Sequence, residues 1–101
     1  MAMDKNAAYI ALTGYDTNQA PEKLTIQNVH PVSLNLNDPV QFHRAYQVVL
    51  GMKDWYLDNR FPSDVGYFRA ILNAADDAYQ QEDKNAMLGT LDDLLYLIKN
   101  W

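Results

Sequence analysis

Two pairs of adjacent aspartates, Asp76-Asp77 and Asp92-Asp93, are the most prominent groups in the chain that could perform acid–base chemistry. Catalysis by carboxylates needs two of them facing each other across a substrate. Neighbouring residues on a helix diverge by about 100° around its axis, so neither pair forms such a dyad by itself. A dyad would need one aspartate from each pair. The outward phase of all four favours solvated carboxylates instead.

The two histidines, His30 and His43, could join Asp38 in a site of two imidazoles and one carboxylate. The chain lacks the H-x-x-x-H and H-E-x-x-H spacings that would support such a metal site. Ser33 and Ser63 are the only serines, and there is no cysteine. Ser63 is better explained as a helix N-cap than as a nucleophile. We therefore expect no metal site, no cofactor and no enzymatic activity.

One arrangement would suit a small enzyme. His43 shares a polar helix stripe with Asp54 and Asp58, and Gly51 leaves a gap in the same stripe. A small enzyme that uses these residues therefore stays an alternative hypothesis.

Composition and charge exclude further classes of protein. The chain has 101 residues, 49% of them hydrophobic, which suits one domain spanning 1–101. Eight basic and thirteen acidic residues give a net charge of −5, which argues against direct nucleic-acid binding. The apolar run Ala7–Leu12 is too short for a signal-peptide core or a membrane span. We expect a cytoplasmic protein that does not bind membranes.

The elements that must position these side chains are mainly helical. Asp38 followed by Pro39 is a typical helix start, and Ser63 is another. The short joint Gln81–Asp83 makes the last two helices an antiparallel hairpin. The predicted fold class is mainly α with minor α+β character: a C-terminal bundle of three helices with an N-terminal β-ribbon or extended arm, over the ranges 1–37 (ribbon or arm), 38–59, 63–81 and 83–100.

The secondary structure of residues 1–37 is harder to assign. Polar and apolar residues alternate in Lys23–Gln27 and in Val32–Asn37, which is typical of half-buried strands. Tyr9–Thr13 fits a third strand or a single helical turn ended by Gly14. The competing interpretation is an extended arm laid across the bundle, without a regular sheet.

The segment from Ala74 to Leu95 resembles one hairpin of the tetratricopeptide kind. The pattern occurs once, whereas solenoids need about three repeats. The resemblance therefore implies no function.

Acids on the predicted hairpin suggest a docking surface. Tyr96 lies one helical turn after Asp92 and Asp93, and Asp76 and Asp77 add charge from the other helix. Aromatic residues concentrate at interface hot spots, and acids steer basic partners. The alternative is a solvated helix face with one exposed tyrosine.

A second candidate surface lies on the helix predicted at 38–59. Its apolar arc is wider than one core contact needs, and Met52 and Trp55 lie along one edge of it with Val48. These residues either cover the N-terminal ribbon or form an interface with a target protein or with a second copy of the chain.

The favoured function is therefore a small acidic, non-enzymatic protein-binding module. It would act as an inhibitor, immunity or adaptor protein that covers a basic surface of a protein target. The alternatives are a structural subunit of a larger assembly, such as a virion or secretion particle, and a nucleic-acid mimic in which aspartates stand in for phosphates.

Overall fold

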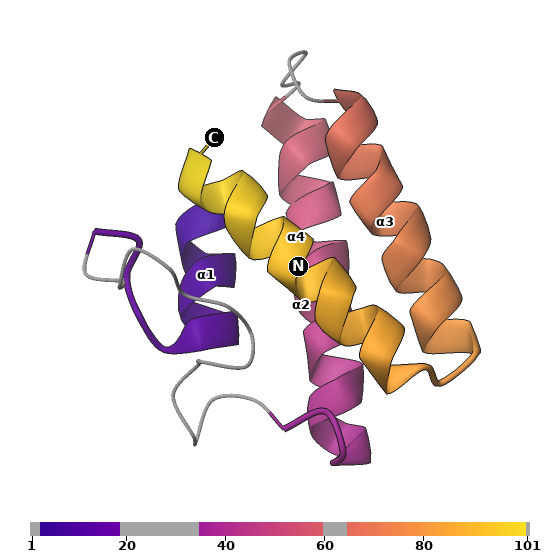
Figure 1. Ribbon diagram of the computed structural model, residues 1–101. Coiled ribbons are helices and arrows are strands. Elements are labelled where there is room, and N and C mark those ends of the chain that lie inside the picture. Colours follow the sequence, from indigo (N-terminus) through magenta and orange to yellow (C-terminus); the bar gives the residue numbers. More distant parts are fainter. Residues whose placement is uncertain (1–2, 19–34, 60–64, 101) are drawn as a thin grey trace.

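Four helices follow one another along the described part of the chain (Figure 1). The structure is a computed structural model that describes residues 3–18, 35–59 and 65–100. The helices are α1 (Lys5–Thr13), α2 (Pro39–Asn59), α3 (Val65–Gln80) and α4 (Lys84–Asn100). The radius of gyration is 12.5 Å, close to the ~13 Å typical of a single domain of 100 residues. The chain is thus one compact helical domain, and the mainly α prediction is confirmed.

The helix α1 replaces the strand or single turn expected at Tyr9–Thr13. The Asp4 carboxylate accepts a hydrogen bond from the Ala7 N–H at 2.7 Å and caps the start. Gly14 ends the helix in the left-handed conformation, with φ of 80°, and its N–H donates to the Ile10 carbonyl. Glycine adopts this conformation without the Cβ penalty of other residues. Two local caps therefore define a complete nine-residue helix.

The predicted β-ribbon is not seen. No strand occurs in residues 3–18, 35–59 and 65–100. The segment Lys23–Gln27 and the first residues of Val32–Asn37 lie outside the described residues. Residues 35–37, at the end of the second expected strand, form a turn that buries Leu36. Among the described residues of this segment, Leu36 is thus buried from a turn and not from a strand.

The hairpin of α3 and α4 is joined by a Schellman turn. The Asp83 N–H donates to the Ala78 carbonyl at 2.9 Å, and the Glu82 N–H donates to the Tyr79 carbonyl at 3.2 Å. Glu82 has a φ of 52° at the position that usually carries glycine. The Asp83 carboxylate then accepts the Ala86 N–H at 3.0 Å and caps α4. The joint is therefore as short as the sequence predicted.

The helices close into a ring. Each helix packs against the next, and α1 also packs against α4. In Figure 1, α4 crosses the front of the molecule between α1 and α3, with α2 behind it. The core combines side chains from all four helices, and its largest fully buried members are Tyr9, Leu12, Val49, Met52, Phe68, Met87, Leu91 and Leu94.

The packing of α1 can be tested with Leu12→Ala. Leu12 is fully buried, so the cavity should cost about 2–5 kcal/mol of unfolding free energy, measured by urea denaturation. Ile10 lies on the same helix but is 44% exposed, so Ile10→Ala should cost less than about 1 kcal/mol. Equal, small effects of both changes would show that α1 is not part of the core.

Candidate functional site

The expected docking residues on α4 lie at the surface. Tyr96 is 67% exposed, and Asp93 is exposed one turn before it. Asp92 is half-buried, on the flank of the same helix. Gly89 is exposed, and a Cβ at that position would meet nothing within 4 Å. The outer side of α4 thus exposes one aromatic ring with two aspartates one turn before it, while Lys99, one turn after it, donates to the Thr17 carbonyl.

The two α3 aspartates have different environments. Asp77 is exposed. Asp76 is half-buried, and its carboxylate accepts a hydrogen bond of 2.5 Å from the Tyr46 hydroxyl on α2. The outward orientation expected for Asp76 is therefore wrong, because α2 covers the flank of α3 on which it lies. Asp76 belongs to the α2–α3 contact and not to the outer side of the hairpin.

The apolar edge of α2 faces inward. Met52 is fully buried and Val48 is 4% exposed, whereas Trp55 is half-buried and packs against the core. Met52 therefore presents no surface to a partner. The width of the apolar arc is explained by two neighbours, because α2 packs against both α1 and α3.

An aromatic stack joins α2 to α3. The Tyr79 ring lies parallel to the Tyr46 ring, with centroids 4.1 Å apart and an interplanar angle of 10°. The Phe42 ring also stacks on Tyr79, at 5.8 Å. The Tyr79 hydroxyl is 2.5 Å from Nδ1 of His43. Both polar tips of the stack therefore have partners, which buried or half-buried tyrosines usually require.

His43 is thus paired across the bundle and not along its own helix. Asp54 lies eleven residues further along α2, about 16 Å away at 1.5 Å per residue. A hollow of 450 Å³ does lie beside Gly51 and Asp54, but His43 does not line it. The structure therefore does not place His43 beside Asp54, as the enzyme alternative requires. The Asp58 side chain is not among those that the structure describes.

The Tyr46–Asp76 pair has an electrostatic consequence. The hydrogen bond to Asp76 raises the pKa of Tyr46 to about 12, with smaller contributions from burial and from the carboxylate charge. The neutral phenol is therefore the form that the folded protein stabilises. This contribution is complete below pH 10, the ordinary pKa, and is lost as the pH rises through 12.

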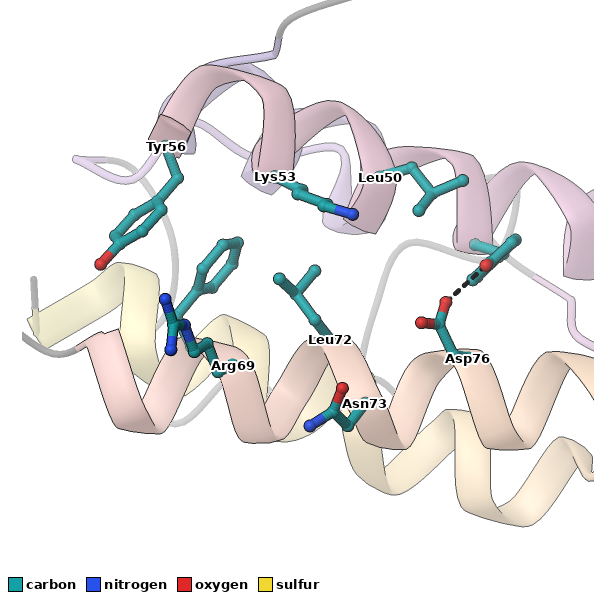
Figure 2. Close-up of a pocket in the computed structure, with 9 residues that line it drawn as sticks. Leu50, Lys53, Tyr56, Arg69, Leu72, Asn73 and Asp76 are labelled. Atoms are coloured by element: carbon teal, nitrogen blue, oxygen red, sulfur yellow. Dashed lines mark hydrogen bonds between the residues drawn. The ribbon is translucent and has the colours of Figure 1, made fainter. Parts of the chain in front are cut away.

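A groove of 490 Å³ opens beside this pair, between α2 and α3 (Figure 2). Leu50 and Leu72 form its middle, and Tyr56 lies toward one end. The Phe68 ring lies 4.9 Å from the Tyr56 ring. Lys53 reaches into it from α2 and Arg69 from α3, as Figure 2 shows. The remaining lining residues are Tyr46, Asn73 and Asp76.

Sequence reasoning did not find this groove. The phase of α3 placed Arg69, Asn73 and Asp76 on a polar side without indicating that α2 borders it. One signal was available: Tyr46 fell within an apolar arc, and a tyrosine in such a position needs a partner for its hydroxyl.

The described residues contain no group of three or more histidine and carboxylate side chains placed to hold a metal ion. No helix among α1–α4 is both long and apolar enough to cross a membrane.

Comparisons of the chain with protein-family models, curated proteins and solved structures found no match.

The Tyr46–Asp76 hydrogen bond can be tested with Tyr46→Phe. The change keeps the stacked ring and should cost about 1 kcal/mol of unfolding free energy at pH 7. The variant should also lose less stability than the parent between pH 10 and 12, because it lacks the shifted phenol. Guanidinium denaturation across this pH range measures both effects.

Tyr96→Phe is the matched control, since it removes a hydroxyl from an exposed ring. It should leave the stability and its pH dependence unchanged. An identical decline of stability with pH in Tyr46→Phe and in the parent would contradict the assigned role of Tyr46.

Proposed function

We propose that the protein is a non-enzymatic binding module whose α4 surface docks on a basic surface of another protein. The observation that carries this proposal is the exposure of Tyr96. At 67%, it is the most exposed large hydrophobic side chain in the described part of the chain. An aromatic ring held this far out on a rigid helix is available for burial in a partner's pocket.

The charges around Tyr96 select the partner. Asp93 and Asp92 precede it by three and four residues, so they lie about one helical turn away on the same side of α4. Asp77 adds exposed negative charge on α3. Such a surface attracts a basic partner during encounter and disfavours an acidic one. Binding would act by covering the partner's basic site, as an inhibitor or immunity protein does.

The same charges argue against a second copy of the chain as the partner. Self-association would bring two copies of the same net negative charge together, and like charges in an interface are costly. Met52 is buried within the chain and adds nothing to a dimer. We therefore favour a different, basic protein over a homodimer. The cytoplasmic location expected from the sequence stays a prediction.

The proposal can be tested by combining Asp93→Lys with Tyr96→Ala. Both side chains are exposed, so the unfolding free energy should change by less than about 1 kcal/mol. A basic partner captured from the native host by the parent protein should bind the variant at least about a hundredfold more weakly. Affinity measured with the purified partner gives the result.

The matched control combines Val40→Ala with Glu82→Lys. It also removes an exposed apolar side chain, 63% exposed at Val40, and changes the net charge by the same amount. This variant should bind like the parent. If the control loses as much affinity as the α4 variant, net charge governs binding and the α4 surface does not. A parent protein that forms large particles in light scattering would favour the assembly-subunit alternative.

A further inference from the structure

The groove between α2 and α3 combines apolar and cationic lining, which sets it apart from the acidic surface of α4. Leu50 and Leu72 are half-buried and face each other across it (Figure 2). Phe68 also lines the groove and is fully buried, with its ring 4.9 Å from the Tyr56 ring. A volume of 490 Å³ lies within the roughly 300–1,000 Å³ typical of small-molecule sites.

The cations of the groove are Lys53 and Arg69. Both are exposed, and they approach the same space from opposite walls (Figure 2). Neither forms an ion pair with a carboxylate of residues 3–18, 35–59 or 65–100. In a protein of net charge −5, two basic side chains thus line one hollow without a described acidic partner, Lys53 pointing toward Leu50 and Arg69 toward Tyr56 (Figure 2). Their charges are therefore available to a ligand.

The two ends of the groove differ in charge. Arg69 and Tyr56 lie toward one end, and Asp76, held by Tyr46, lies at the other (Figure 2). An anionic group is attracted to the Arg69 end and repelled from the Asp76 end. A guanidinium also offers a planar pair of donors that matches a carboxylate. A ligand would thus lie with its charge between Lys53 and Arg69 and its apolar body along Leu50 and Leu72.

We propose that this groove binds a small organic acid, a free molecule that carries one carboxylate on an aromatic or aliphatic body. The apolar lining favours such a body, and the two cations, which have no ion-pair partner among the described residues, favour an anionic group such as a carboxylate. The size of the groove favours a free small molecule over a segment of protein. The groove contains no residue of the α4 surface, so a test of this proposal does not test the proposed function.

The experiment is a titration of the labelled protein with 2-naphthylacetate, followed by the amide signals in NMR. The signals of residues on both walls, Leu50, Lys53, Arg69 and Leu72, should shift together in a saturable way. The neutral analogue 2-(2-naphthyl)ethanol should bind at least about tenfold more weakly, because it lacks the charge. Absence of saturable shifts, or equal binding of the alcohol, would overturn the proposal.

Variants then locate the charge. Lys53→Ala combined with Arg69→Ala should weaken binding at least about tenfold, and circular dichroism should show an unchanged helical content. Lys84→Ala combined with Arg44→Ala removes two exposed cations outside this groove and should change affinity by less than about twofold. Equal losses in the two variants would show that only the overall charge attracts the anion.

Asp76→Asn gives a result that a merely structural role would not. The amide oxygen can still accept the Tyr46 hydrogen bond, but the repelling charge is gone, so naphthylacetate should bind more tightly. Weaker binding would contradict the proposed orientation.

A short peptide with a C-terminal phenylalanine distinguishes the two sources of a carboxylate on an apolar body, a protein C-terminus and a free small molecule. Tighter binding of this peptide than of naphthylacetate would overturn the assignment to a free small molecule.

Discussion

Burial of the apolar side of α4 is the constraint on which the rest of the structure depends. Leu91, Leu94, Leu95 and Ile98 are all at most 3% exposed, and they are covered from two sides because α4 packs against both α3 and α1. Neither neighbour alone could cover a stripe this wide. The α2 helix then closes the remaining side of the ring by packing against α1 and α3. The exposed side of α4 is the part left over once this burial is complete.

The contact between α2 and α3 is built differently. One part of it consists of stacked aromatic rings whose hydroxyl groups reach His43 and Asp76. The groove that Lys53 and Arg69 line lies beside these rings. The molecule therefore has an aliphatic contact at α4, and a more polar contact between α2 and α3 where a ligand can reach the groove.

Local chemistry made the three C-terminal helices predictable from the sequence. Asp38 and Asp83 cap helices in the structure as their residue types suggest, and the apolar stripes of α3 and α4 mark their buried sides. The same logic would have found α1 from Asp4 and Gly14, but its short apolar run also fitted a strand. A run of nine residues contains too few turns for periodicity to decide.

The candidate sites were predictable only in part, for a geometric reason. Helical phase distinguishes the buried side of a helix from the exposed side, and Tyr96 and Asp93 are exposed as their phase indicates. Phase does not say which neighbour borders each flank. Asp76 and Arg69 lie on a flank that only the packing of α2 turns into a groove wall. Met52 faced inward for the same reason, because α2 has neighbours on two sides.

Closure of the ring also has a consequence for the order in which the chain folds. Lys99 at the end of α4 donates a hydrogen bond to the Thr17 carbonyl, which joins positions 82 residues apart in the sequence. Closing so long a loop costs more entropy than closing the α3–α4 hairpin. An isolated helix of nine residues is also unstable in water, so α1 forms only as it docks. The hairpin thus depends on local contacts, whereas α1 depends on the rest of the core.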